Sequence, residues 1–176
     1  MVRGNRCWNH GPMAVTLHPI GRTDREHVLR LNADHVELLS PLDDDRLTVL
    51  QQLADRAAVI DVDGAFGGFV VTVAPGSEYD SDNYRWHVER FGSRFYYLDR
   101  VVVAPGFRRS GTARAVYDEL EALATPYGRM VLEVNVEPPN VPSLRFHEGR
   151  GYVEVGRFGP RGHVVAMMSR ELSASS

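Results

Sequence analysis

The segment Arg108-Arg109-Ser110-Gly111-Thr112-Ala113 has the composition of an anion-binding turn, because it stands between an apolar run and an amphipathic run. Glycine lets the backbone approach a ligand closely, and the first N–H groups of a helix have no partner within it. Such a helix start binds phosphate or pyrophosphate. The segment lacks the Gly-Lys-Ser/Thr of a P-loop and the spacing of a dinucleotide loop. Taken alone, it is equally an ordinary strand-to-helix turn with a packing glycine.

Hydrophobic periodicity predicts the elements that must position this turn. Apolar or alternating runs predict strands over residues 15–20, 58–62, 66–73, 95–103, 130–136, 152–158 and 164–170. Apolar spacings of three and four predict helices over residues 24–32, 83–90, 108–124 and 142–148. The turn therefore joins the strand over 95–103 to the helix over 108–124.

Local signals refine three of these boundaries. Thr23 with Glu26 resembles a capping box and predicts a helix start at Asp24. Ser40 followed by proline predicts a further helix, with serine as N-cap and proline at the first helical position. Asp63-Gly64, between two strand patterns, predicts a tight hairpin.

The element order β-α-α-β-β-α-β-α-β-α-β-β predicts an α/β (α+β) fold, in which helices cover both faces of a mixed sheet. We expect one domain over residues 13–172. Residues 1–12 contain no apolar core of a secretory signal, so we expect a loosely ordered leader, with Met13 as an alternative start. Residues 173–176 are expected to form a frayed tail.

Composition narrows the function classes. The net charge of −3, without a basic stripe, disfavours nucleic-acid binding. No run of eighteen apolar residues occurs, which disfavours a membrane span. The single cysteine, Cys7, excludes an internal disulfide and fits a cytoplasmic location. The histidines show no shared ligand spacing, so we expect no metal site.

Two motifs, in order and on the expected elements, carry a family resemblance. Arg108-x-x-Gly111-x-Ala113 matches the [Gln/Arg]-x-x-Gly-x-[Gly/Ala] signature of the GNAT superfamily of acyl-CoA N-acyltransferases. The second motif resembles the family's N-x-x-[SA]-x-x-[FL]-[YH]-x-x-x-G-[FY] and reads Asn140-x-x-Ser143-x-x-Phe146-His147-x-x-x-Gly151-Tyr152. The element order agrees over roughly residues 14–171. The resemblance implies a mainly antiparallel twisted sheet of six to seven strands.

The resemblance also implies that acetyl-CoA, or another acyl-CoA, is the donor. Backbone amides at the start of the long helix would hold the pyrophosphate, next to Arg108 and at Arg109, Gly111, Thr112, Ala113 and Arg114. The pantetheine arm would run along Val101, Val102 and Val103. The thioester would lie where the fourth and fifth strands diverge, with Asn140, Ser143 and Phe146 nearby.

Two residues are candidates for proton transfer. Many relatives carry tyrosine at the position of His147, where it serves as general acid toward the CoA sulfur. Histidine can also donate a proton, but its pKa near 6.5 leaves a mixture of forms at neutral pH. Asp99 stands where many relatives carry an acid on the fourth strand, and an attacking amine needs a base. The alternatives are a helix-surface role for His147 and an ion pair between Asp99 and Arg100.

The acceptor side is less specified. Tyr79, Tyr84 and Trp86 lie in a polar, aromatic insert that could hold a cationic amine; alternatively, Tyr84 and Trp86 pack the insert onto the core. Glu133 and Asn135 on the fifth strand are further candidates for contacting the amine.

The sequence therefore predicts an N-acetyltransferase in which a primary amine, on a small molecule or a protein, attacks acetyl-CoA directly in a ternary complex. A homodimer is possible in such a family. The alternative is a non-catalytic acyl-CoA-binding or sensing module with the same fold, which would need no proton path through Asp99 and His147.

Overall fold

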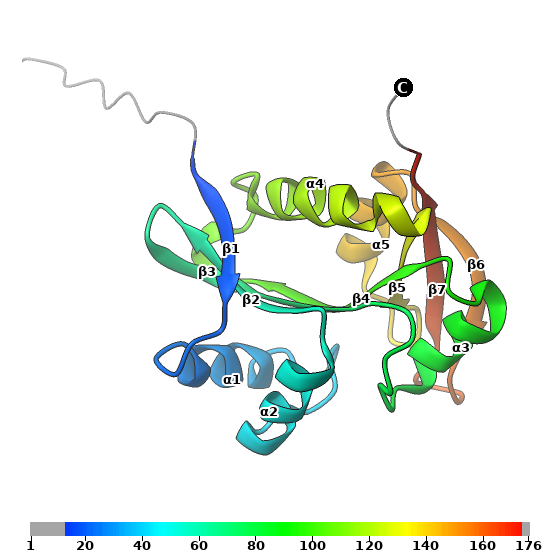
Figure 1. Ribbon diagram of the computed structural model, residues 1–176, viewed down its shortest axis with the longest axis horizontal. Coiled ribbons are helices and arrows are strands. Elements are labelled where there is room, and N and C mark those ends of the chain that lie inside the picture. Colours follow the sequence, from blue (N-terminus) through cyan, green and yellow to red (C-terminus); the bar gives the residue numbers. More distant parts are fainter. Residues whose placement is uncertain (1–12, 174–176) are drawn as a thin grey trace, which may run out of the picture.

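The computed structural model describes residues 13–173 of the chain, so the expected leader and residues 174–176 lie outside the described residues. Seven strands and five α-helices follow one another in the predicted order (Figure 1). The strands are β1 (Val15–Pro19), β2 (Arg56–Val62), β3 (Ala65–Val73), β4 (Tyr96–Val103), β5 (Arg129–Asn135), β6 (Val153–Phe158) and β7 (Val165–Glu171). The helices are α1 (Arg25–Ala33), α2 (Asp44–Leu53), α3 (Asp82–Phe91), α4 (Thr112–Ala124) and α5 (Val141–Gly149).

The strands form one sheet in the order β1-β2-β3-β4-β5-β7-β6. Every neighbouring pair is antiparallel except β4 and β5, which are parallel. The expected mixed, mainly antiparallel sheet is therefore confirmed. The hairpin at Asp63-Gly64 is also present, and both residues have the positive φ angles, 52° and 83°, that a tight two-residue turn requires.

Two helix starts differ from the prediction. The capping box does not form: Asp24, not Thr23, is the N-cap of α1 and makes no side-chain cap hydrogen bond, and its carboxylate accepts the N–H of Gly21 at 2.8 Å. Helix α2 begins not at Ser40 but at Asp44, with Asp43 as its N-cap. Ser40 stays in the loop because its carbonyl accepts hydrogen bonds from the buried side chains of Asn32 and Arg100.

Helix α4 also begins later than expected. Its first residue is Thr112, because Arg109 and Gly111 both have left-handed backbone conformations, with φ of 59° and 95°. A short 3₁₀ turn over Pro105–Phe107 leads into this loop. The anion-binding turn is thus a separate loop between β4 and α4, with the helix N-terminus at its end.

Helices cover both faces of the sheet, as Figure 1 shows. Helices α1 and α2 pack on one face through residues such as Val28 and Leu47, and α3 covers the same face through Tyr84. On the opposite face, α4 contributes Val116 and Leu120 to the largest core cluster, against which α5 also packs. None of the helices within residues 13–173 combines the length and apolar character needed to cross a membrane.

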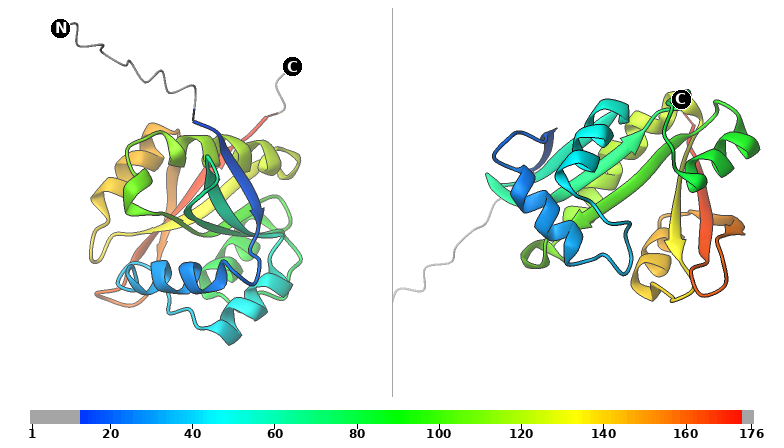
Figure 2. Two further views of the ribbon diagram at one scale, coloured as in Figure 1. Left: turned by 90° about the vertical axis from the view of Figure 1, so that its left-hand side faces the viewer. Right: turned by 90° about the horizontal axis from the view of Figure 1, so that it is seen from below.

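Strands β4 and β5 pair only at their beginnings. Tyr96 pairs with Met130 and Tyr97 with Val131, and no further pair joins the two strands. Beyond these pairs the strands diverge, as the right-hand view of Figure 2 shows. The backbone edge of β4 from Leu98 onward therefore has no ladder partner on this side among the described residues. Its polar groups can bind a ligand, except the Val103 carbonyl, which accepts the guanidinium of Arg108.

Candidate active site

Strand β4 carries a β-bulge at the point where it leaves β5. Leu98 pairs with Thr72 and Arg100 pairs with Val71, so Asp99 is an extra residue without a partner in β3. Successive residues of a regular strand point to opposite faces. The bulge instead turns the side chains of both Asp99 and Arg100 to the face covered by α1, α2 and α3.

A cavity of about 350 Å³ lies between the diverging ends of β4 and β5. The start of α4, the start of α5 and the loop after α1 complete its walls. It brings together predicted residues from both motifs and both strands, namely Asp99, Val101, Val102, Val103, Arg108, Ala113, Glu133, Asn135, Asn140, Ser143, Phe146 and His147.

A second cavity, of about 600 Å³, adjoins the first on the face covered by α1, α2 and α3. The loop after α1, the segment before α3 and the loop between β6 and β7 form its walls. The two cavities share lining residues, namely Leu38, Leu39, Asp99, Arg100, Glu133 and Asn135. Two ligands, one in each cavity, would therefore meet between Asp99 and Glu133.

The N-terminus of α4 is open to an anion. Its N-cap, Gly111, provides no side-chain hydrogen bond, so the N–H groups of Thr112, Ala113 and Arg114 have no partner within the helix. Arg109 and Arg114 are exposed beside this end. Arg108 is less free, because its guanidinium donates to the carbonyl of Val103 at 3.1 Å and lies 2.5 Å from Nε2 of His35.

His147 is buried and hydrogen-bonded through both ring nitrogens. Nδ1 lies 2.7 Å from the carbonyl oxygen of Ser143, which can only accept, so Nδ1 carries the proton. Nε2 then accepts from the hydroxyl of Tyr117 at 2.6 Å. Burial lowers the pKa of His147 to about 4, although the Ser143 carbonyl favours the charged ring. At neutral pH the imidazole is therefore neutral and offers no proton to the cavity. Helix-surface exposure, the alternative for this residue, is excluded.

Asp99 has both carboxylate oxygens occupied. Oδ1 accepts the hydroxyl of Tyr79 at 2.6 Å, and Oδ2 accepts Nε of Arg100 at 2.7 Å. Only 6% of the Asp99 side chain is exposed. The ion pair with Arg100, considered above as an alternative, is thus present, yet Asp99 also lines both cavities.

The carboxylate of Glu133 differs from that of Asp99, because only one of its oxygens accepts hydrogen bonds from the described residues. Oε1 accepts hydrogen bonds from the Tyr97 hydroxyl and the Asn83 amide, each at 2.8 Å. Oε2 is buried and has no partner within the described residues. Burial, followed by the charge of Asp99, raises the pKa of Glu133 to about 8. A carboxylate with one free oxygen and such a pKa can accept a proton from an amine.

The predicted aromatic cluster divides into two parts. Tyr79 lines the second cavity beside Asp99. Tyr84 belongs to α3 and is buried, and its hydroxyl donates to the carbonyl of Ala74 at 2.9 Å. Trp86 packs on β6 so closely that a Cβ on Gly156 would lie 2.6 Å from its ring. Tyr84 and Trp86 therefore pack the insert onto the core and line neither cavity.

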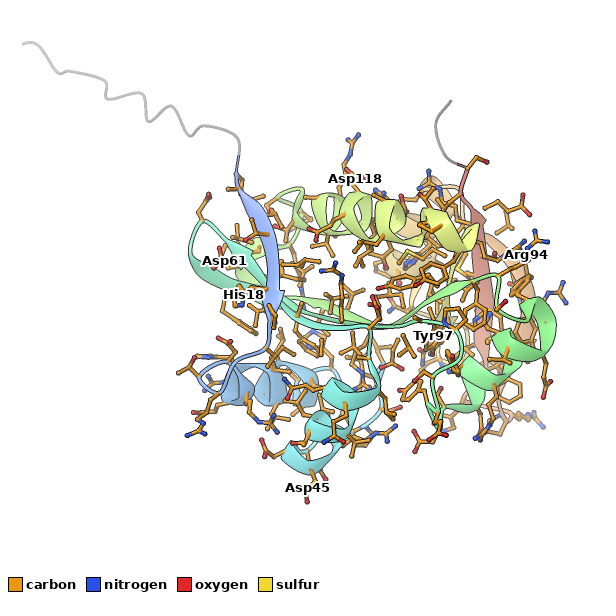
Figure 3. All side chains as sticks on the ribbon, in the orientation of Figure 1. His18, Asp45, Asp61, Arg94, Tyr97 and Asp118 are labelled. Atoms are coloured by element: carbon orange, nitrogen blue, oxygen red, sulfur yellow. The ribbon has the colours of Figure 1, made fainter. Side chains whose placement is uncertain are left out.

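Several lining residues had no signal in the sequence. The side chain of Tyr117 points in the same direction as that of Ala113, which lies one helical turn before it. The sequence, however, indicated only that Tyr117 faces the core. Figure 3 shows the next residue, Asp118, on the outer side of α4. His35, Leu38 and Leu39 follow the end of α1, where no motif marked them.

Comparison with known proteins agrees with this geometry. A family described as the acetyltransferase (GNAT) family matches residues 30–152, which include both motifs and most of the sheet. No curated protein matches the sequence significantly.

Solved structures with the same fold cover nearly the whole chain. Ard1 from Thermoplasma volcanium is 20% identical, with a TM-score of 0.69 over 92% of this chain and 99% of that one. Spermidine N-acetyltransferase from Vibrio cholerae, in complex with CoA and spermine, is 20% identical, with a TM-score of 0.66 over 89% and 95%. The ribosomal-protein-S18-alanine N-acetyltransferase from Escherichia coli is 15% identical, with a TM-score of 0.65 over 93% and 97%. Because the family match spans most of the chain and includes the cavity, this protein belongs to the GNAT family of acetyltransferases.

Proposed function

We propose that this protein transfers an acetyl group from acetyl-CoA to a primary amine by direct attack in a ternary complex. The observation that carries the proposal is the meeting of two cavities at Glu133 and Asp99. The first cavity includes the start of α4 at Ala113, and the second lies on the face covered by α1, α2 and α3. Such an arrangement would hold both substrates at once, which would remove most of the entropic cost of their encounter.

The donor would occupy the cavity along β4. The N–H groups of Thr112, Ala113 and Arg114 would bind the pyrophosphate, because they have no partner and the helix dipole is positive there. The unpaired edge of β4 over Val101–Val103 would bind the amide groups of pantetheine in the manner of an added strand. Asn140 caps α5 by accepting the N–H of Ser143 at 3.3 Å. This hydrogen bond fixes the start of α5, which forms the wall of the cavity opposite β4.

Glu133 is the proposed base. It would take a proton from the attacking amine through Oε2, directly or through one water molecule. Asp99 then has a different role, since its charge raises the pKa of Glu133 while its own oxygens stay bound to Tyr79 and Arg100. Main-chain N–H groups on the free edge of β4 would stabilise the oxyanion of the tetrahedral intermediate.

The acceptor side favours an amine that carries positive charge. The acidic residues that line the second cavity are Glu37, Asp82, Asp99 and Glu133, against Arg46 and Arg100. Both arginines are already paired, Arg46 with Asp80 and Arg100 with Asp99. Asp82 likewise pairs with Arg85, and Glu133 is mostly protonated at pH 7, so Glu37 is the acidic lining residue that could meet a cation directly. Tyr79 and Asn135 add hydrogen-bonding groups. Two of the similar structures are enzymes named for amine acceptors, spermidine and a ribosomal-protein alanine, so polyamines and protein N-termini are the first acceptors to test.

The experiment is an assay of free thiol release from acetyl-CoA with a panel of amines that includes polyamines, amino acids and N-terminal peptides. We expect turnover with at least one cationic primary amine, and loss of that turnover in Glu133→Gln with acetyl-CoA binding retained. Glu26→Gln, on the exposed face of α1, is the matched control. Tight acetyl-CoA binding without turnover across the panel would instead indicate the non-catalytic sensing module.

A further inference from the structure

We propose that the hydroxyl of Tyr117, and not the side chain at position 147, is the group that stabilises the departing CoA thiolate. His147 is then a positioning residue that holds this hydroxyl. The inference rests on the proposed acetyl transfer. It differs from what the family resemblance implies, because that resemblance places the acid on α5, whereas Tyr117 belongs to α4.

The hydrogen bonds around His147 support this assignment. Nδ1 donates to the Ser143 carbonyl, so Nε2 has only a lone pair to offer. That lone pair accepts the Tyr117 proton at 2.6 Å. Of the two side chains, only Tyr117 therefore carries a hydrogen that can be turned toward a sulfur atom.

The position of Tyr117 on α4 also supports the assignment of its hydroxyl to the thiolate. Ala113 and Tyr117 lie one turn apart on one face of α4, about 6 Å along its axis, and both line the first cavity. The Tyr117 hydroxyl lies one hydrogen bond beyond Nε2 of His147, and both residues line the first cavity. Helix α4 thus contributes a phenol to the cavity wall next to the histidine of α5.

The surroundings keep Tyr117 protonated. The residue is buried, and burial raises the pKa of its hydroxyl well above the usual value. Two charged groups lie near it, the guanidinium of Arg150, 5.4 Å from the ring centre, and the carboxylate of Glu121, which pairs with Arg150. These opposite charges act in opposite directions on the pKa of Tyr117. A phenol in this state is a hydrogen-bond donor and does not release its proton.

Tyr117 transfers no proton in the proposed chemical step. The amine nitrogen bonds to the acetyl carbon and gives one proton to Glu133. The carbon–sulfur bond then breaks, and its electron pair goes to sulfur. The Tyr117 O–H turns from Nε2 of His147 to this thiolate and stabilises it, and the thiolate takes its proton from water after release. The products are an amide, CoA and, once Glu133 has lost its proton to solvent, the starting enzyme.

The test combines turnover with a direct measurement on the thiol. Tyr117→Phe keeps the ring and removes the hydroxyl, and we expect kcat to fall at least about 10-fold with little change in the Kd of CoA. The thiolate absorbance of CoA bound at saturation, followed against pH, should show a thiol pKa lower in the wild-type protein than in Tyr117→Phe. This titration needs no acceptor, so it tests Tyr117 even if no amine is acetylated and the proposed function fails.

Two further variants make the result decisive. Tyr152→Phe removes a neighbouring buried hydroxyl that donates to Glu121 and does not line the cavity, so it should leave kcat and the thiol pKa unchanged. His147→Gln keeps an acceptor for Tyr117 and should lower kcat less than Tyr117→Phe. The inference is overturned if Tyr117→Phe matches the wild type in kcat and thiol pKa, or if His147→Gln is the more damaging change.

Discussion

The Tyr97 hydroxyl lies 2.8 Å from Oε1 of Glu133, on the side of the carboxylate that faces the buried aromatic cluster. This hydrogen bond and the one from Asn83 use the same oxygen. Oε2 is left without a hydrogen-bond partner among the described residues, and the core beneath fixes the orientation of the proposed base through Oε1. Figure 3 labels Tyr97 between the sheet and α3.

The first prediction concerns the pH dependence of turnover. Because the pKa of Glu133 is about 8, most of the carboxylate is protonated at pH 7. We expect kcat, measured at saturating substrates, to rise with pH through about 8, and Glu133→Gln to lower kcat about 100-fold or more and to lose this ionisation. A wild-type profile flat between pH 6.5 and 9 would exclude Glu133 as the base.

The second prediction separates the two carboxylates. Asp99→Asn removes a negative charge that raises the pKa of Glu133 and leaves the opposing influence of Arg100. We expect the midpoint of the kcat profile to move to lower pH, with kcat above the midpoint reduced less than in Glu133→Gln. Abolished turnover at every pH, with acetyl-CoA binding intact, would instead assign the base to Asp99.

The third prediction concerns stability at alkaline pH. Glu133 has a pKa of about 8 in the folded protein, above its value in the unfolded chain, so the folded state binds the proton more tightly. Its contribution to stability is fully present below about pH 4.5 and is lost as pH rises through about 8. Between pH 5 and pH 9, the wild-type protein should lose up to about 4 kcal/mol more unfolding free energy than Glu133→Gln does, measured by urea denaturation. The same pH dependence in both proteins would contradict the shifted pKa.

The fourth prediction concerns acid. His87 is fully buried among aromatic rings, and burial lowers its pKa to about 3. The unfolded chain takes up a proton near pH 6.5, so stability falls as pH drops from about 6.5 toward 3. In His87→Phe, the loss of unfolding free energy between pH 7.5 and 5 should be smaller by about 2 kcal/mol. Exposed His27→Gln is the control and should behave like the wild type.

The fifth prediction concerns the loop before α4. Gly111 has a φ of 95°, and a Cβ there would meet no atom within 4 Å, so the cost of a side chain is conformational. Gly111→Ala should lower the free energy of unfolding by about 1 kcal/mol and raise the Kd of CoA. Gly106→Ala, in the same loop without a positive φ, should change neither quantity. Calorimetry of CoA binding would decide, since equal affinities would exclude the loop from donor binding.

The sequence predicted the strands of the sheet because their signals are local, and the expected donor site rests on an equally local motif. Apolar runs mark the strands, and the spacing from Arg108 to Ala113 lies within a single turn. The start of α2 could not be placed, because the buried guanidinium of Arg100 and the amide of Asn32 hold Ser40 in the loop. Those contacts join residues far apart in the chain.

The proposed catalytic groups were harder to predict, because their environment comes from residues far apart in the chain. The pKa of Glu133 depends on burial and on Asp99 in the neighbouring strand. Tyr117 had the spacing of a core residue, and only the folded structure shows that it lines the cavity and that its hydroxyl binds His147 from α5. Trp86 lies in a segment whose composition suggested ligand binding. Its ring instead packs on β6, because Gly156 has no side chain there.

The two cavities share only the residues at their junction, so a donor in one and an acceptor in the other would occupy largely separate space. Neither substrate would then obstruct the entry of the other, and either could bind first. Free CoA should accordingly compete with acetyl-CoA but not with the amine, whereas the acetylated product should compete with the amine alone. The divergence of β4 and β5 would thus determine the inhibition pattern as well as the place of the proposed reaction.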